Sequence, residues 1–131
     1  MVKYYHFMNK KAKDVFINHI AARIENADSS FLNCPELLEE ALTKVCQETG
    51  LSIVKRVSHQ FNPTGVSLVF ILGESHLAVH TWPESKFAHL DLVTCSGATN
   101  VNILKNSLIK NFKTDQIKIK IIDDWIWNKK T

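Results

Sequence analysis

The centre of this sequence is the stretch Gly73-Glu74-Ser75-His76-Leu77-Ala78-Val79-His80-Thr81-Trp82-Pro83-Glu84. It brings a serine, two histidines, two carboxylates and an indole into one hairpin-sized segment. The run before it, 66–72, is almost wholly apolar and rich in β-branched and aromatic residues, which predicts a buried strand that ends at the glycine. The run 76–82 alternates, so its two histidines and its tryptophan are expected on one face of a second strand.

Further elements are predicted on both sides of this hairpin. Apolar spacing predicts a helix that begins near Pro35, a residue suited to a first helical turn, and stops at Gly50. The other segments predict strands over 15–24, 51–59, 87–95 and 117–122, a second amphipathic helix over 101–112, turns over 26–30 and 62–65, and an irregular arm over 1–14.

These elements predict an α+β fold, a two-layer sandwich in which an antiparallel sheet carries helices on one face. At 131 residues and 45% hydrophobic content, the chain is long enough for one compact domain and short for two, so a single domain over 1–131 is expected. The uncovered face is interpreted as an active-site floor, a subunit interface, or both. On that face the alternation predicts Ser67, His76, His80, Trp82, His89, Asp91 and Cys95.

Composition argues against several classes of protein. The chain has 16 basic and 13 acidic residues, a net charge of +3, and its short lysine clusters lack interleaved aromatics, which indicates a solvated surface and no nucleic-acid partner. No apolar run approaches the ~20 residues of a membrane span and no secretory signal opens the chain, so a soluble cytoplasmic protein without a membrane partner is expected. Three cysteines without a CxxC pair favour reduced thiols.

Two familiar chemistries fit the central stretch poorly. Along a strand, His76 and His80 would lie ~13 Å apart, too far for one metal ion, so no metal site is predicted, although cross-strand combinations stay open. A serine hydrolase would need Gly-x-Ser-x-Gly at a strand-to-helix turn, and the segment around Ser75 lacks the second glycine.

A third chemistry lets Ser75 act on its own backbone. Its hydroxyl can attack the carbonyl of Glu74 and convert the amide to an ester. Elimination of that ester and hydrolysis of the resulting dehydroalanine leave a pyruvoyl group at a new N-terminus. An oxyanion partner and a base are needed, and Ser67 and His80 could supply them if the hairpin brings them towards the turn. The ketone would form a Schiff base with an amine and act as an electron sink.

The same residues carry a family resemblance. The segment 74–84, preceded by Phe61-Asn62-Pro63-x-Gly65-Val66-Ser67 and followed by Asp91-Leu92-Val93-Thr94-Cys95, closely resembles the prokaryotic S-adenosylmethionine decarboxylase proenzyme family. The resemblance covers about 32–95. It implies a two-layer α/β sandwich that forms a homodimer sheet to sheet, and a pyruvoyl-dependent enzyme that makes decarboxylated S-adenosylmethionine for spermidine synthesis.

Residue roles follow from the same resemblance. It implies cleavage between Glu74 and Ser75, a β chain of 1–74, and an α chain of 75–131 headed by the pyruvoyl group. Ser67 and His80 match processing residues, and Cys95 matches the thiol that returns a proton after CO2 leaves. Two positions match substrate-binding residues: Glu84 for the ribose hydroxyls and Phe61 for stacking on adenine.

Two alternatives stay open at this point. Arg23 stands where the family often has an acidic residue, and an arginine near a cationic sulfonium is unfavourable, so the same mechanism could act on arginine or ornithine. The chain could also be an unprocessed homologue that serves as a ligand-binding or regulatory partner.

Overall fold

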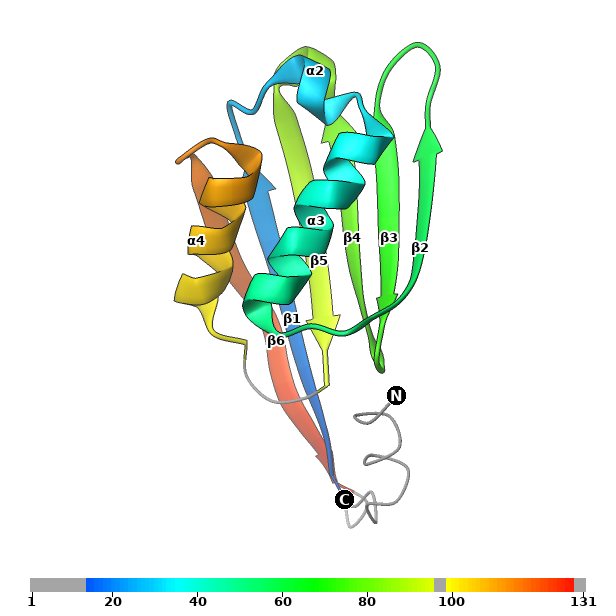
Figure 1. Ribbon diagram of the computed structural model, residues 1–131. Helices are drawn as coiled ribbons and strands as arrows, with labels where there is room; N and C mark the ends of the chain where they lie inside the picture. The colour runs from blue at the N-terminus through cyan, green and yellow to red at the C-terminus, as the bar shows by residue number, and fades with distance from the viewer. Residues whose placement is uncertain (1–13, 96–98, 129–131) are drawn as a thin grey trace.

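The protein folds as an antiparallel sheet with helices on one face. The computed structural model describes residues 14–95 and 99–128, with side chains described between positions 15 and 123 (Figure 1). Six strands pair in the order β2-β3-β4-β5-β1-β6, and every neighbouring pair is antiparallel. The strands are β1 (Asp14–Ile24), β2 (Ile53–Gln60), β3 (Val66–Leu72), β4 (Ser75–Trp82), β5 (Phe87–Thr94) and β6 (Ile117–Asn128).

The helices lie together on one side of the sheet, in front of it in Figure 1. They are α2 (Ser29–Leu32), α3 (Pro35–Thr49) and α4 (Val101–Phe112), and a short 3₁₀ turn, η1 (Pro83–Ser85), follows β4. The predicted helix start and stop are confirmed, because Pro35 opens α3 and Gly50 ends it in the left-handed conformation that glycine favours. Within the described ranges, no helix is long and apolar enough to cross a membrane.

The predicted alternation along β4 is confirmed. Leu77, Val79 and Thr81 are buried under the helices, whereas His76, His80 and Trp82 are exposed on the other side. We call that other side, which no described helix covers, the open face of the sheet. The sequence pattern therefore predicted the two faces of β4 correctly, and the two histidines of the central stretch lie on the open face.

Several predicted boundaries differ from the structure. The predicted turn over 26–30 ends early because the Asp28 carboxylate accepts a hydrogen bond from the Phe31 amide (2.9 Å) and starts α2 at Ser29. The last strand was predicted to end at Ile122 but continues to residue 128, since a bulge between His19 and Ile20 lets β6 keep pairing with β1. Of the predicted arm 1–14, only the last residue is described, and it begins β1.

Buried hydroxyl and amide groups tie the helix layer to one end of the β3–β4 hairpin. The Thr81 hydroxyl donates to the Leu32 carbonyl (2.7 Å) and accepts from the Val66 amide (2.9 Å). Next to it, the Asn33 side chain accepts from the Gly65 amide (2.9 Å). These bonds fix the loop between β2 and β3, which leads into Ser67.

Helices α3 and α4 are joined through the carboxylate of Glu48. It accepts hydrogen bonds from Lys110 (2.7 Å), Ser107 (2.6 Å) and Asn111 (2.9 Å), all on α4. The hydrogen bonds from Lys110, Ser107 and Asn111 lower the pKa of Glu48 from 4.5 to about 2. The carboxylate is thus held in its charged form by the neighbouring helix.

We expect Glu48→Gln to destabilise the fold at neutral pH and to lose this effect in acid. A pKa lowered by folding contributes stability that is complete above about 4.5, and this contribution disappears as the pH falls towards 2. Thermal unfolding of the wild type and the variant between pH 7 and pH 2.5 should show melting temperatures that converge. Glu40→Gln, which breaks only an exposed pair with Lys44 (3.3 Å), is the control, and a gap that stayed constant with pH would contradict the assignment.

Candidate active site

The turn between β3 and β4 carries the predicted cleavage position. Leu72 and Ser75 form the last pair of the hairpin, so Gly73 and Glu74 make the turn. Glu74 has a φ of 66°, a left-handed backbone conformation that residues other than glycine rarely adopt and that costs of order 1–3 kcal/mol. The Ser75 hydroxyl donates to the Gly73 carbonyl (3.3 Å). The peptide bond between Glu74 and Ser75 therefore sits in a strained, tight turn.

Cys95 reaches this turn from the end of β5. Its thiol donates to the backbone carbonyl of Glu74 (3.1 Å) and lies 3.4 Å from the Oε2 atom of the same residue. The Glu74 carbonyl is the group that the Ser75 hydroxyl would attack. A hydrogen-bond donor on that oxygen polarises the carbonyl and stabilises the negative charge that develops on it during attack.

The side chain of Glu74 is itself unusual. Its Oε1 atom is buried and has no hydrogen-bond partner among the residues that the structure describes. Burying such an oxygen without a partner costs free energy, and such atoms concentrate at functional sites. The carboxylate of Glu74 and the thiol of Cys95 thus lie together, partly shielded from water, beside the predicted cleavage position.

Ser67 and His80 form a second constellation on the open face. The Ser67 hydroxyl and the His80 Nδ1 atom are hydrogen-bonded at 2.6 Å, and the two residues are a cross-strand pair of β3 and β4. His80, however, lies five residues along β4 from Ser75, about 17 Å at ~3.3 Å per residue. The hairpin joins the two processing candidates to each other but holds them away from the turn of the same chain.

The two predicted substrate-binding residues lie at the Ser67 end. Phe61 precedes β3, is 48% exposed and packs edge-on against His59, with ring centroids 4.6 Å apart. Glu84 lies in η1, which follows β4, and its side chain is exposed. The predicted residues therefore divide into two groups at opposite ends of the β3–β4 hairpin: Glu74, Ser75 and Cys95 at the turn, and Phe61, Ser67, His80 and Glu84 at the other end.

One contact on the open face was not foreseen. Nε2 of His19, on β1, donates to Oδ1 of Asp91 (2.6 Å), and Nε2 of His76 lies 3.5 Å from the other oxygen of that carboxylate. The sequence pattern placed His76 and Asp91 on this face but left out His19, which is 72 residues away from Asp91 in the chain. The alternation of 15–24 was the signal that could have found it. Three His, Cys, Asp or Glu side chains suited to one metal ion do not occur within the described ranges.

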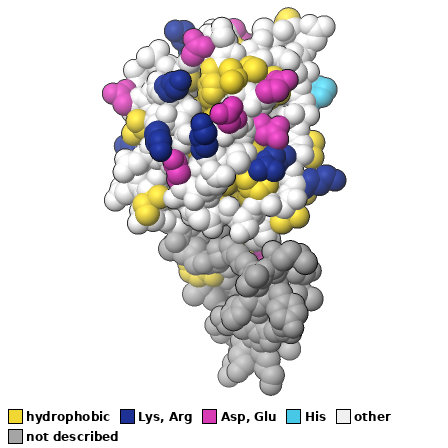
Figure 2. Space-filling view, viewed as in Figure 1, with side chains coloured by type: hydrophobic (Ala, Val, Ile, Leu, Met, Phe, Trp, Pro, Cys, Tyr) yellow, Lys and Arg dark blue, Asp and Glu magenta, His cyan; other side chains and the backbone are white. Residues whose placement is uncertain are grey.

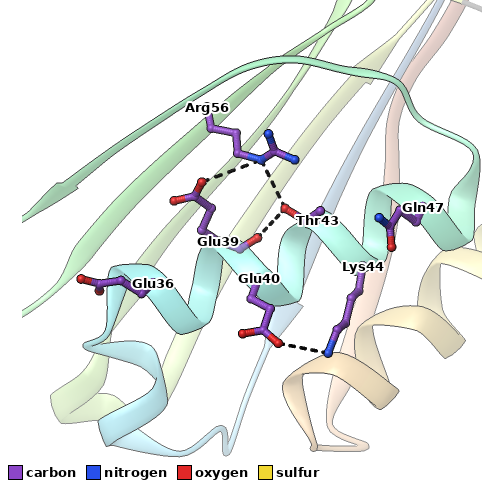
Figure 3. A pocket seen from close by; sticks show the side chains of 7 residues that line it. All are labelled: Glu36, Glu39, Glu40, Thr43, Lys44, Gln47 and Arg56. Carbon is purple, nitrogen blue, oxygen red and sulfur yellow. Dashed lines mark hydrogen bonds and ion pairs between the residues drawn. The ribbon is translucent and has the colours of Figure 1, made fainter.

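Two surface depressions among the described residues lie away from the predicted site. One, of about 450 Å³, lies between α3 and β2, where Arg56 is bound by Glu39 (3.8 Å) and Thr43 (3.3 Å) (Figure 3). Another, of about 580 Å³, lies beside the start of β5. Figure 2 shows that basic and acidic side chains alternate over the helix-covered side, which is typical of a solvated surface. Within the described part of one protomer, the predicted residues are spread along the open face and the β3–β4 turn, and no described helix faces them.

Comparison with known proteins decides the family. The sequence model of the S-adenosylmethionine decarboxylase family matches residues 18–124. The chain belongs to this family. The predicted resemblance is confirmed and extends well beyond 32–95, since it includes much of β1, all of α4 and much of β6.

Relatives and a solved structure agree with this assignment. The chain is 39% identical to an S-adenosylmethionine decarboxylase proenzyme of Acetivibrio thermocellus over 95 residues, which is 72% of this chain and 77% of that protein. A proenzyme of the same name from Thermoanaerobacter sp. is 42% identical over 82 residues, 63% of this chain and 66% of that protein. The crystal structure of the adenosylmethionine decarboxylase from Aquifex aeolicus superposes with a TM-score of 0.71 at 25% identity, over 84% of this chain and 90% of that one.

These findings confirm three predictions: the family, the α+β class with its six-stranded antiparallel sheet, and membership of an enzyme family. Both bacterial relatives are named for S-adenosylmethionine, and nothing in their names favours arginine or ornithine. Arg23, which raised that alternative, is exposed and lies opposite His89 in the sheet register.

Proposed function

We propose that this chain is a proenzyme that cleaves itself between Glu74 and Ser75 and then decarboxylates S-adenosylmethionine through a pyruvoyl group made from Ser75. The observation that carries the proposal is the hydrogen bond from the Cys95 thiol to the Glu74 carbonyl in a left-handed turn. Family membership and the word proenzyme in the names of its relatives support it. The products would be a β chain of 1–74 and an α chain of 75–131.

Cleavage needs a nucleophile, an activated carbonyl and a base. The Ser75 oxygen bonds to the Glu74 carbonyl carbon, the C–N bond breaks, and the serine nitrogen leaves as an amine, which gives an ester. A base then removes the Ser75 α-proton, and the main-chain carboxylate of Glu74 leaves as the new C-terminus of the β chain. The resulting dehydroalanine takes up water and releases ammonia, which leaves the pyruvoyl group in amide linkage to His76. Cys95 would polarise the carbonyl, and a hydrogen-bonded Ser67–His80 pair would suit the proton transfers.

The Ser67–His80 pair would have to come from a second copy of the chain. In one protomer, about 17 Å along β4 separates His80 from Ser75, which is too far for proton transfer. If two sheets stack face to face about a two-fold axis that lies between them and runs across the strands, the Ser67–His80 end of one copy faces the Ser75–Cys95 end of the other. Such an isologous homodimer would complete two equivalent sites.

The open face has the composition that such an interface requires. Bulky apolar side chains project from it beside the histidines, and Val57, Val69, Ile71 and Trp82 are all at least 36% exposed in the protomer. Exposed apolar surface of this kind is characteristic of subunit contacts. A facing sheet would also supply the missing wall over the site and exclude water from the turn.

In the decarboxylation step, the keto group, once formed, supplies an electrophilic carbonyl for the substrate amine and an electron sink for the bond that loses CO2. The Cys95 thiol would return the proton to the carbon that loses CO2. Glu84 and Phe61 would bind the ribose hydroxyls and the adenine ring from the other end of the hairpin, so the same dimer would bring substrate-binding and reacting residues together.

The test of this function is release of labelled CO2 by purified protein. We expect release from carboxyl-labelled S-adenosylmethionine, and none above background from arginine or ornithine. Size-exclusion chromatography with light scattering should give twice the mass of 14.9 kDa, because both fragments of both copies stay together. Protein that is cleaved but releases no CO2 from S-adenosylmethionine would contradict the substrate assignment.

Removing the thiol of Cys95 should slow both self-cleavage and decarboxylation. In Cys95→Ala the Glu74 carbonyl loses its side-chain donor, so cleavage should slow from the wild-type rate, and the cleaved fraction should decarboxylate about 100-fold or more slowly, within the range for loss of a general acid. Timed mass spectrometry of freshly purified protein measures the first effect and CO2 release measures the second. Cys34→Ala, at the half-buried cap residue that precedes α3, is the control, and wild-type rates in Cys95→Ala would exclude the proposed role.

A further inference from the structure

Strand β5 and Cys95, the residue that follows it, contact the chain on both sides of the bond that is proposed to break. On one side, Cys95 binds Glu74 through two oxygens. On the other, Asp91 lies 3.5 Å from the ring nitrogen of His76, the residue that follows Ser75. Side chains of β5 and of the next residue thus contact the chain on each side of this bond.

The sheet register explains how Asp91 binds two histidines at once. His76 on β4 and His19 on β1 are both cross-strand neighbours of Val93. Asp91 lies two residues earlier on β5, on the same face, and is therefore a diagonal neighbour of both rings. Its Oδ1 accepts from His19 at 2.6 Å, which fixes the carboxylate so that Oδ2 faces His76. All three side chains are about one third to one half exposed.

Cleavage would change what holds the start of β4. In the intact chain, the turn links Ser75 to β3, but after scission residue 75 becomes a chain end and that covalent link is gone. The first side chain along the new chain is that of His76. Its ring is held by Asp91, while its backbone is held by its neighbours in β3 and β5.

We propose that Asp91, oriented by His19, is a positioning residue for the keto group. This inference rests on the proposed function and adds to it. By holding His76, Asp91 limits the positions that the adjacent chain end can take, so that the carbonyl stays beside Cys95 after the chain has been cut. Asp91 itself is not required to touch the substrate.

A loss of this contact should affect the rate more than binding. Misplacement of a reacting group by about 1 Å can cost two orders of magnitude in rate, and a loosened chain end samples many such positions. The variant leaves the groups proposed to bind the ribose and the adenine, Glu84 and Phe61, unchanged, and Asp91 is not proposed to touch the substrate, so the substrate KM should change little.

The experiment compares Asp91→Ala with Asp115→Ala, an exposed aspartate in the loop before β6, at the far end of the sheet from the turn. Three measurements are made on each protein: the cleaved fraction by mass spectrometry, the hydrogen–deuterium exchange of the peptide 75–82, and kcat and KM for S-adenosylmethionine. Titration with phenylhydrazine counts the keto groups. If Asp91→Ala does not fold, Asp91→Asn is measured in its place by the same criteria.

For Asp91→Ala we expect full cleavage, one keto group per chain, faster exchange in 75–82, a kcat at least about tenfold lower, and a KM within about twofold. Asp115→Ala should match the wild type in every measurement. Wild-type exchange and kcat in cleaved Asp91→Ala would overturn the inference and leave the proposed function intact. Failure of a folded Asp91→Ala to cleave would also overturn it, because Asp91 would then act before the keto group exists. An uncleaved wild type would overturn both proposals.

Discussion

Ser75→Ala is expected to leave the chain in one piece and without activity. Alanine has no hydroxyl to attack the Glu74 carbonyl, so neither the ester nor the keto group can form, and CO2 release should fall to background. The fold should persist, since Ser75 lies at the turn and the hydrogen bond from its hydroxyl to the Gly73 carbonyl is long at 3.3 Å. Denaturing electrophoresis and mass spectrometry read the result directly.

Ser30→Ala is the matched control, because this serine is exposed on α2 and far from the turn. It should cleave and turn over as the wild type does. Cleavage of Ser75→Ala at the same bond would mean that a contaminating protease cuts the exposed hairpin. The proposed chemistry would then have no support from the observed fragments.

The second expected result concerns two defective chains expressed together. His80→Ala alone should stay uncut, because it lacks the base, and Ser75→Ala alone should stay uncut, because it lacks the nucleophile. In a mixed dimer, the Ser75→Ala copy still carries an intact Ser67–His80 pair, and this pair would face the intact Ser75 of the other copy. About half of the His80→Ala chains should then be cleaved, since random pairing at equal amounts puts half of them opposite a complementing copy.

The fragment 75–131 that carries alanine at position 80 identifies the chain that was cut. Co-expression of His80→Ala with Ser67→Ala is the control, since both changes damage the same donated pair and neither combination of copies restores it. That mixture should give no fragments. If His80→Ala stays uncut beside Ser75→Ala, the pair does not act across the dimer, and the arrangement proposed for the two sheets is wrong.

Much of the fold could be predicted because local signals were strong. The alternation of 76–82 assigned each side chain of β4 to the correct face, and Pro35 and Gly50 marked both ends of α3. The bulge at His19 could not be predicted, because it depends on how β6 pairs with β1 across about a hundred residues of chain. The short helix α2 was missed for another reason: Asp28 and the two serines after it are equally typical of a turn and of a helix cap.

The residues of the candidate site could be selected from the sequence, but their arrangement could not. The motif around Ser75 contains the proposed nucleophile and His80, and its flanks contain Ser67 and Cys95. Only the register of the sheet shows that Cys95 binds the Glu74 carbonyl while the Ser67–His80 pair lies at the other end of the hairpin. His19 was missed because its partner, Asp91, is adjacent in the sheet and distant in the chain.

The most direct measurement is the mass of the freshly purified wild-type chain under denaturing conditions, with and without prior borohydride reduction. We predict two fragments that meet between Glu74 and Ser75, and an α fragment that gains two hydrogens on reduction because its first residue carries a ketone. An intact chain of 14.9 kDa, or an α fragment that begins with ordinary serine, would contradict the proposal that Ser75 makes its own catalytic group.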